Sequence, residues 1–292
     1  MPNDIRLSES KVGVIINTSS GGFDSESEQK ILSILTHAGI VEPKVWCDSA
    51  DAMTRSLVEA TGQNLDVLIV FGGDGTIRTA AEACAEKGLY FIPLPGGTMN
   101  MLPRALYGDV AWEETLKNTL TAPSPKMLSG GRIAGKQFLI AAIVGAPALL
   151  AEPRESMRHG NIVDAIEKGS VAFRKMFETK IQYLISGEMK GEAEAVALIC
   201  PLISEQMSDS EQALEAAVVD VKSAAEVIGL LSTATFGKWR DHRNIVLAKT
   251  KRVSVQSSKD IPATLDGEIV SLGTSAEINF VSRALTVLVP AK

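Results

Sequence analysis

A glycine-rich segment directly after an apolar run limits the fold of this chain more than any other feature. Residues 67–70 (VLIV) predict a buried strand, and residues 71–76 (FGGDGT) follow before a stretch with helical periodicity. Glycines at a strand-to-helix turn permit positive φ, and they let an anion approach the N–H groups of the helix N-terminus. We therefore expect an α/β fold with a phosphate-binding turn at this position.

The carboxylate of Asp74 inside this turn needs an explanation, because an acid next to phosphate groups repels them. A divalent cation between the two removes the repulsion, so the segment indicates Mg-nucleotide chemistry. The structural alternative is a turn that uses glycine for its geometry and Asp74 as the N-cap of the following helix.

A second glycine turn follows the next predicted strand. Residues 89–94 (LYFIPL) form another apolar run, and residues 95–100 (PGGTMN) come directly after it. In a parallel sheet both turns lie at the same carboxyl edge, which is where open α/β folds bind ligands. The two turns together predict one nucleotide site at that edge.

The pattern of apolar and polar residues changes after Leu120. Before this point predicted strands alternate with helices, which is typical of a parallel sheet covered on both faces. After it, short apolar runs between polar turns indicate mainly antiparallel β structure, with a helical insertion at residues 155–177. The expected early strands are residues 12–16, 45–46, 67–71 and 90–94, and the expected helices are 29–38, 52–60 and 76–87. The expected later strands are 138–144, 181–185, 195–200, 218–221, 245–248, 253–256, 276–280 and 284–289.

Three motifs occur in an order that resembles the diacylglycerol kinase catalytic family, which includes bacterial lipid kinases and sphingosine kinases. They are GGDGT at residues 72–76, GTMN at residues 97–100 and DGE at residues 266–268. The segment INTSSGG at residues 16–22 is similar to the family's Asn-Pro-x-Ser-Gly turn, with Thr18 in place of proline. Any one motif alone has low specificity, whereas the ordered set is specific.

The resemblance implies two domains. The first is an α/β domain with a parallel sheet, as in NAD kinases and diacylglycerol kinases, and the second is a mainly antiparallel β domain that binds the substrate. Because the C-terminus of the family returns to the first domain, the predicted limits are residues 1–122 with 284–292 for the first, and 123–283 for the second.

The resemblance also implies an activity, namely ATP-dependent transfer of the γ-phosphoryl group to a lipid hydroxyl in a cleft between the domains. The acceptor is a lipid such as diacylglycerol or a sphingoid base, and the cofactors are ATP and Mg²⁺. Asp266 is the expected base with Glu268 assisting, Asp74 acts through the metal or nucleotide, and Glu211 is a second candidate metal ligand. The roles of Asp74 and Asp266 stay interchangeable, because a sequence contains no distances. The residues expected to hold the nucleotide are Asn17, Ser20, Gly72, Gly73, Gly75, Thr76, Gly96, Gly97, Thr98 and Asn100.

Two segments depart from the family pattern. Arg78 and Thr79 stand where the family usually has Asn-Glu, and residues 211–215 (EQALE) stand where it has Asp-Gly-x-Leu-Asp at a magnesium site. The sequence does not decide whether these changes impair catalysis. Two alternatives therefore stay open: an NAD kinase-like phosphotransferase, which shares GGDG, and a non-catalytic nucleotide-binding regulatory protein.

One further motif is a decoy. Residues 130–137 (GGRIAGKQ) match the start of a Walker A loop, but Gln137 stands where Ser or Thr must ligate Mg²⁺. A predicted strand also follows the motif instead of preceding it, so we interpret the segment as a hairpin turn.

The amino-acid composition limits the kinds of molecule that this chain can bind. A net charge of −6 and a pI near 5.3 argue against non-specific nucleic-acid binding, and against electrostatic adhesion as the main membrane anchor. Three widely spaced cysteines and the absence of a signal-peptide core favour a cytoplasmic location. A lipid acceptor would require local, peripheral contact with the inner face of the membrane. The sequence specifies neither the acceptor nor the oligomeric state.

Overall fold

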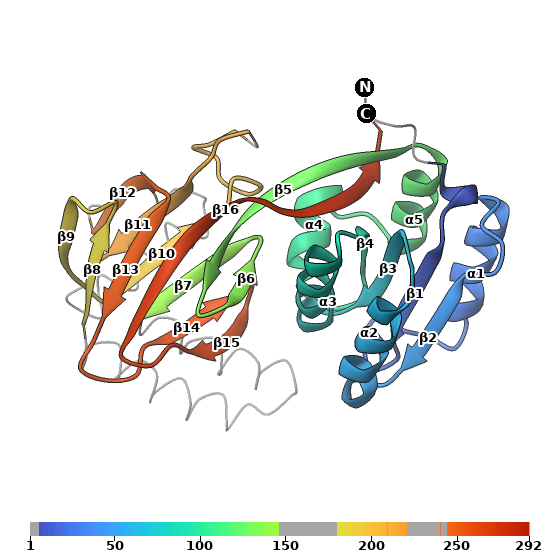
Figure 1. The fold of residues 1–292 in the computed structure, drawn as a ribbon, viewed down its shortest axis with the longest axis horizontal. Helices are drawn as coiled ribbons and strands as arrows, with labels where there is room; N and C mark the ends of the chain where they lie inside the picture. Colours follow the sequence, from blue (N-terminus) through green and yellow to red (C-terminus); the bar gives the residue numbers. More distant parts are fainter. Residues whose placement is uncertain (1–5, 146–179, 209, 221–239, 241–243, 292) are drawn as a thin grey trace. The chain divides into compact units, whose positions relative to one another are not determined.

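The computed structural model describes residues 6–145, 180–208, 210–220, 240 and 244–291. The chain forms two compact units, which are Met1–Leu128 with Arg283–Lys292, and Ser129–Ser282. Strand β5 (Pro123–Ile133) leads out of the first unit, and the long strand β16 (Ser275–Pro290) leads back into it (Figure 1).

A parallel sheet in the order β2-β1-β3-β4-β16 forms the centre of the first unit. Every residue of β1 and β3 is buried, as expected for strands that are covered on both faces. The predicted parallel sheet is confirmed. The strands, besides the C-terminal part of β16, are β1 (Val12–Asn17), β2 (Lys44–Asp48), β3 (Val67–Gly72) and β4 (Tyr90–Pro95).

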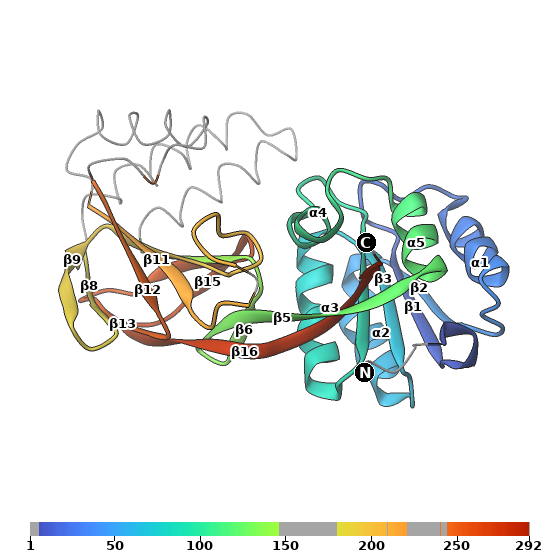
Figure 2. The same ribbon diagram turned by 90° about the horizontal axis from the view of Figure 1, so that it is seen from above.

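Helices cover both faces of this sheet (Figures 1 and 2). Helices α1 and α5 contact each other, and so do α2 and α3. On the α1 and α5 side, the rings of Trp112 and Phe71 pack in a T-shaped arrangement, with the ring centroids 5.4 Å apart. The helices are α1 (Ser27–His37), α2 (Met53–Gly62), α3 (Asp74–Lys87), α4 (Met101–Tyr107) and α5 (Trp112–Thr121), and short 3₁₀ turns are formed by η1 (Leu7–Glu9) and η2 (Ala50–Ala52).

Two of these helices are absent from the sequence-based expectations, namely α4 and α5. Helix α4 has only seven residues, so it contains too few turns for a periodic pattern. It also contains Pro103, which a helix tolerates only in its first turn. The predicted helix stops at Gly39 and Gly88 are confirmed, because both adopt left-handed backbone conformations with φ of 78° and 69°.

The second unit contains a sheet in the order β12-β11-β10-β7-β14-β15, in which all neighbouring strands are antiparallel. A second layer contains β13 between β8 and β16, with β8 also paired to β9, and the β5–β6 hairpin. The prediction of a mainly antiparallel unit is confirmed. The remaining strands are β6 (Lys136–Phe138), β7 (Ala141–Gly145), β8 (Ile181–Ile185), β9 (Met189–Ala193), β10 (Ala195–Ile199), β11 (Leu214–Val219), β12 (Ile245–Thr250), β13 (Arg252–Gln256), β14 (Pro262–Leu265) and β15 (Glu268–Ser271).

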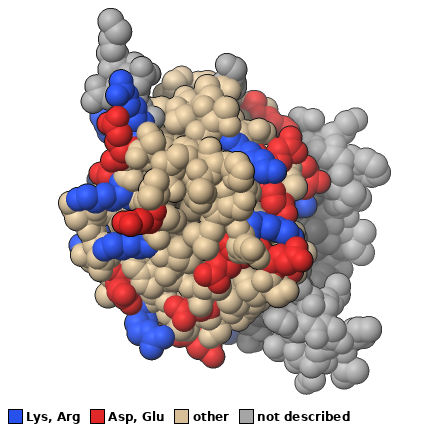
Figure 3. Space-filling model, turned by 90° about the vertical axis from the view of Figure 1, so that its right-hand side faces the viewer, with Lys and Arg blue, Asp and Glu red and all other residues tan. Residues whose placement is uncertain are grey.

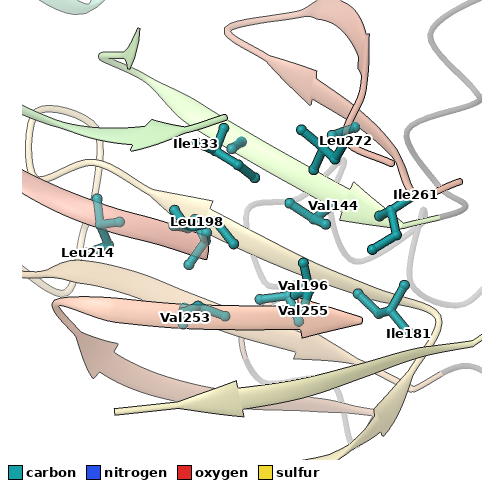
Figure 4. Packing of buried hydrophobic residues seen from close by; sticks show 14 of the residues in the cluster. Ile133, Val144, Ile181, Val196, Leu198, Leu214, Val253, Val255, Ile261 and Leu272 are labelled. Carbon is teal, nitrogen blue, oxygen red and sulfur yellow. The ribbon is translucent and has the colours of Figure 1, made fainter. Parts of the chain in front are cut away.

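The core of the second unit lies between its two layers. Val144, Val196 and Leu198 from one sheet pack in the same cluster as Val253 and Val255 from the other (Figure 4). Alternate residues of each strand thus face inward, which leaves the other residues of the first sheet on its outer face.

The decoy motif is a hairpin turn, as predicted. Residues Ala134 and Gly135 join β5 to β6 with φ of 48° and 80°, a pattern typical of a two-residue type I′ turn. The predicted helix at residues 155–177 lies outside the described residues. Among the helices that the structure describes, none is long and apolar enough to cross a membrane.

Candidate active site

The carboxyl ends of β1, β3 and β4 lie side by side and carry the predicted nucleotide-binding residues. From β1 the chain continues to β2 on one side, whereas β3 pairs with β1 on the other side. The order therefore reverses between β1 and β3, and such a switch point is where open α/β sheets bind ligands. Asn17 ends β1, Gly72 ends β3 and Pro95 ends β4.

The side chain of Asn17 connects the end of β1 to the start of α3. Its Nδ2 donates a hydrogen bond to Thr76 Oγ1 at 2.8 Å, and its Oδ1 accepts one from the N–H of Ser19 at 2.9 Å. Asn17 is buried, and both bonds hold it in one orientation. The two hydrogen bonds thus fix the side chain of Asn17 next to the glycine turn.

The hydroxyl of Ser20 lies in the segment that follows β1. Its oxygen is buried and has no hydrogen-bond partner among the residues that the structure describes. A buried hydroxyl without a partner costs about 1–3 kcal/mol, and a phosphate oxygen is an acceptor that would satisfy it. This group therefore fits a bound nucleotide at the edge.

The two glycine turns pack against each other through their backbones. Gly96 donates its N–H to the carbonyl of Gly72 at 3.0 Å. A Cβ on Gly96 would lie 2.9 Å from the nitrogen of Gly72, and a Cβ on Gly97 would lie 2.8 Å from the Cα of Gly73. Both distances are shorter than real Cβ contacts allow, so close approach of the two turns requires glycine at these positions.

The positive φ that glycine permits does not occur at these five glycines. Gly72, Gly73, Gly75, Gly96 and Gly97 all lie outside the positive-φ glycines, and the φ of Gly73 is −80°. The physical reason is that the turn at Gly73 already has the extended backbone of a helix N-cap, which any residue adopts. Gly75 itself lies in the first turn of α3.

The left-handed residue at this edge is Asn100, with φ of 50°. Asn tolerates this conformation better than most residues. Its Oδ1 accepts a hydrogen bond from the N–H of Gly97 at 2.8 Å, and its Nδ2 donates one to the carbonyl of Gly97 at 2.7 Å. These two bonds close the loop around Thr98, which is exposed.

Asp74 connects the first glycine turn to the second. Its Oδ2 accepts a hydrogen bond from the N–H of Asn100 at 3.0 Å, and its Oδ1 accepts one from the N–H of Met101 at 2.6 Å. The carboxylate thus satisfies N–H groups at the start of α4, where a helix leaves its donors unpaired. Asp74 is the first residue of α3 and does not cap it, because Gly73 occupies that N-cap. The alternative that Asp74 caps its own helix is therefore wrong.

Asp266 and Gly267 form the two-residue turn between β14 and β15. Their φ values are 48° and 89°, and Asp-Gly is a preferred sequence for such a type I′ turn. The DGE motif therefore also has a purely structural explanation, which sequence reasoning missed. The signal was present, since Asp-Gly between two apolar runs is the strongest short-range indication of a hairpin.

The carboxylate of Asp266 is buried and highly coordinated. It accepts hydrogen bonds from the N–H groups of Leu139 at 2.8 Å, Ile140 at 2.9 Å and Ala141 at 3.0 Å, and the residue is 8% exposed. An ionised carboxylate offers about four acceptor positions, so these bonds occupy most of them. Burial, followed by the nearby charge of Asp266, raises the pKa of the Cys200 thiol well above its usual value. That thiol is therefore kept protonated and unreactive.

Glu268 is the first residue of β15 and is opposite Leu265 in the β14–β15 pair. It is partly exposed, and its carboxylate makes no side-chain hydrogen bond to any residue that the structure describes. Glu268 is thus available to a substrate, although the structure shows no bond between it and Asp266 within the described chain.

The acids of the segment at residues 211–215 have protein cations as partners. Lys249 pairs with Glu211, and the buried Glu215 accepts a hydrogen bond from Arg240 Nε at 2.7 Å. The hydrogen bond to Glu215 raises the pKa of Arg240 above its usual value. Strand β11 begins at Leu214 and not at residue 218 as expected, because pairing of Glu215 with Arg240 allows an acid inside a buried strand. Throughout the described residues, no cluster of three or more His, Cys, Asp and Glu side chains could hold a metal ion.

The face of the molecule in Figure 3 carries basic and acidic side chains close to one another. Oppositely charged side chains also pair before α1 and in its first turn, where Lys30 contacts Asp24 and Glu26. Neighbouring charges of opposite sign produce no extended field of a single sign on this face.

Comparison with known proteins adds independent evidence. Residues 11–127 match the diacylglycerol kinase catalytic domain. A protein of Streptococcus pneumoniae named "Putative lipid kinase" is 33% identical over 105 residues, which are 33% of this chain and 34% of that protein. The chain thus spans about a third of the length of that relative. A "Diacylglycerol kinase" of Staphylococcus aureus (strain JH9) is 24% identical over 273 residues, which are 87% of this chain and 85% of that protein.

A solved structure shows the same fold. The crystal structure of a "putative diacylglycerol kinase" from Bacillus anthracis str. Sterne superimposes with a TM-score of 0.74 at 22% identity. The superposition covers 96% of this chain and 97% of that one, so the likeness extends over both units.

Proposed function

We propose that this chain, whose residues 11–127 match the diacylglycerol kinase catalytic domain, transfers the γ-phosphoryl group of ATP to a hydroxyl of a lipid. The observation that carries the proposal is the carboxyl edge of the first unit. Two glycine turns meet there at the switch point of a parallel sheet, beside a buried hydroxyl of Ser20 that has no partner among the described residues.

The residues at this edge would bind and orient the nucleotide. Ser20 would donate to a phosphate oxygen, and the N-terminus of α3 would direct its dipole toward the phosphates. Mg²⁺ would neutralise phosphate charge, and Asp74 would hold it together with the phosphate oxygens. A magnesium ion bound through one or two carboxylates plus phosphates is the usual arrangement, so a single acid is sufficient. The assignment of Glu211 as a second ligand stays a prediction.

In this proposal Asp266 receives the proton of the acceptor hydroxyl. The bond between the γ-phosphorus and the bridging oxygen of ATP breaks, a bond between that phosphorus and the lipid oxygen forms, and ADP leaves. The backbone N–H groups of Leu139, Ile140 and Ala141 fix the carboxylate in place. Such preorganisation is what a general base requires, and Glu268 is the nearest further acid in the sequence.

A row of side chains that are apolar except for Thr264 supports a lipid as the acceptor. The strand register aligns six residues across the outer face of the sheet, from β12 to β15. Ile143 and Ile269 are 37% and 44% exposed, whereas Ala217 and Thr264 are buried. We call these six residues the outer row: Leu247, Ala217, Ala197, Ile143, Thr264 and Ile269.

The outer row lies next to the proposed base. Asp266 bonds to Ala141, which precedes Ile143 by two positions and therefore faces the same side of β7. An apolar surface beside the base suits an acyl chain, whereas NAD is polar and charged. The row thus favours a lipid kinase over an NAD kinase.

The test is phosphoryl transfer from ATP with three kinds of acceptor. We expect turnover with vesicles that contain diacylglycerol or a sphingoid base, and no turnover with NAD or without an acceptor. ATP binding measured by calorimetry should weaken when Mg²⁺ is removed. Equal ATP affinity with and without Mg²⁺, or transfer to NAD alone, would contradict the proposal.

Variants of the outer row test the lipid directly. Ile143→Ser and Ile269→Ser should raise the KM for lipid and leave the Kd for ATP unchanged, since they remove apolar area only. Val246→Ser is the matched control. Val246 is also exposed, but it pairs with the inward-facing Val218 of β11 and therefore lies on the face opposite to the outer row. The control should keep the KM of the parent.

A further inference from the structure

Arg78 is a partly buried cation one helical turn beyond Asp74. Residues four apart on a helix are neighbours on its surface, so Arg78 and Asp74 lie on the same side of α3. The side chain of Arg78 is only 16% exposed. Arginine is seldom buried unless its donors are paired, so the surroundings of this guanidinium need to be considered.

The guanidinium of Arg78 is incompletely satisfied. Its Nη1 donates to Glu82 Oε1 at 3.2 Å, but its Nε is buried and has no hydrogen-bond partner among the described residues. A guanidinium has five N–H donors in a fixed planar arrangement, which suits a phosphate or carboxylate that can accept two of them. Within the part of the chain that the structure describes, this Nε is therefore a buried donor without an acceptor.

The three segments that form the candidate nucleotide site contain no positively charged side chain. Residues 17–20, 72–76 and 95–100 contain no Lys or Arg, and their one charged side chain is Asp74. Arg104 of the neighbouring helix α4 is 51% exposed and pairs with Asp109. A triphosphate at this edge would meet one carboxylate and, within α3, one incompletely paired cation.

We propose that Arg78 binds a phosphate group of the nucleotide through its Nε and an Nη donor. The inference rests on the proposed function. It assigns a role to a residue that replaces the neutral amide most often found at this position in the resembling family. The bond would satisfy the buried Nε and would place a positive charge beside the phosphates that Asp74 repels.

The inference predicts effects of opposite sign on folding and binding. Arg78→Met keeps most of the side-chain length and removes the unpaired donor, so the Tm of the unliganded protein should stay the same or rise. The Kd for ATP should increase about 10- to 100-fold, as expected for loss of a hydrogen bond to a charged group. The Kd of Arg78→Lys for ATP should lie between those of the parent and Arg78→Met, because an ammonium keeps the charge but lacks the planar arrangement of donors.

The experiment is calorimetric titration of the full chain with ATP, tripolyphosphate and adenosine, combined with thermal unfolding. Arg104→Met is the matched control, since it removes an arginine from the adjacent helix that already pairs at the surface. We expect weaker binding of ATP and tripolyphosphate by Arg78→Met, unchanged binding of adenosine, and parental binding by Arg104→Met.

Two kinds of result would overturn the inference, namely unchanged ATP binding by Arg78→Met and absence of binding by the parent, and they are distinguishable from each other. If the parent binds ATP and Arg78→Met binds it equally well, Arg78 does not contact phosphate. A lower Tm together with the parental Kd would show that Arg78 serves only its pair with Glu82. If the parent binds neither ATP nor tripolyphosphate, the proposed function fails and this inference fails with it.

Discussion

Asp74 of the GGDGT motif and Asp266 of the DGE motif differ in burial and in the number of backbone N–H groups that they accept. Asp74 is partly exposed at a sheet edge and accepts two backbone N–H groups, from Asn100 and Met101. Asp266 is buried in a hairpin turn and accepts three, all from the segment that leads into β7. Both acids therefore hold two chain segments together, in addition to any chemistry. The difference in burial and in donor number predicts that substitutions will affect folding and catalysis in different proportions.

The largest effect is expected for Asp266→Asn. If Asp266 is the general base, kcat should fall about 10²- to 10⁴-fold. The new amide nitrogen is a donor and accepts no hydrogen bond, so at least one of the three N–H groups loses its acceptor and the free energy of unfolding should also fall by about 1–3 kcal/mol. Both quantities are measured on an acceptor that the parent phosphorylates, by initial rates and by urea unfolding.

A control is needed because a destabilised protein also loses activity. Ile181→Val removes one methylene from the core of the second unit and should cost about 0.5–1.5 kcal/mol without touching the turn. It should keep the parental kcat. A parental kcat in Asp266→Asn would refute the base assignment and leave Asp266 with a structural role alone.

The next effect concerns the contact between the glycine turns. A Cβ on Gly97 would lie 2.8 Å from the Cα of Gly73, whereas a Cβ on Gly73 would meet nothing closer than 3.9 Å. Gly97→Ala should therefore lower the free energy of unfolding by about 1–3 kcal/mol, and Gly73→Ala should change it by less than about 0.5 kcal/mol.

This pair of variants also locates the phosphate path. If Gly73→Ala folds like the parent but binds ATP more weakly, the open side of Gly73 faces the nucleotide. Equal ATP binding by Gly73→Ala would place the phosphates elsewhere along the edge. Thermal unfolding and calorimetry on both proteins supply the comparison.

A smaller loss of stability than for Gly97→Ala is expected for Asp74→Asn. An amide can still accept one of the two N–H groups at the start of α4, so the free energy of unfolding should fall by about 0.5–2 kcal/mol. If Asp74 holds Mg²⁺, the dependence of ATP affinity on magnesium should decrease as well, because a neutral amide is a poorer ligand. Asp109→Asn, which alters a surface pair with Arg104, serves as the control. Unchanged magnesium dependence together with lost turnover would favour Asp74 as the base.

Local patterns determined much of the fold. Apolar runs predicted strands β1, β3 and β4, glycine predicted the ends of α1 and α3, and the change in texture after Leu120 predicted antiparallel structure. These features depend on neighbours within a few residues, so a single sequence contains the whole signal. The motifs are short and local too, and their order along the chain was sufficient to indicate the resemblance to diacylglycerol kinases.

Only the tertiary structure decided what each motif residue contacts. Gly72 and Gly96 are 24 positions apart in the numbering, yet their backbones approach so closely that a side chain would not fit. Asp74 reaches the start of α4, and Asp266 reaches a strand more than 120 positions earlier. The outer row consists of residues from six strands that only the sheet register aligns. Such contacts form between segments that are distant in the sequence. The residue pattern within one segment does not identify the residues of another segment that it will contact. The sequence by itself thus determined which residues stand at the ends of strands, and the packing of those ends decided which of them hold the fold and which are left for a ligand.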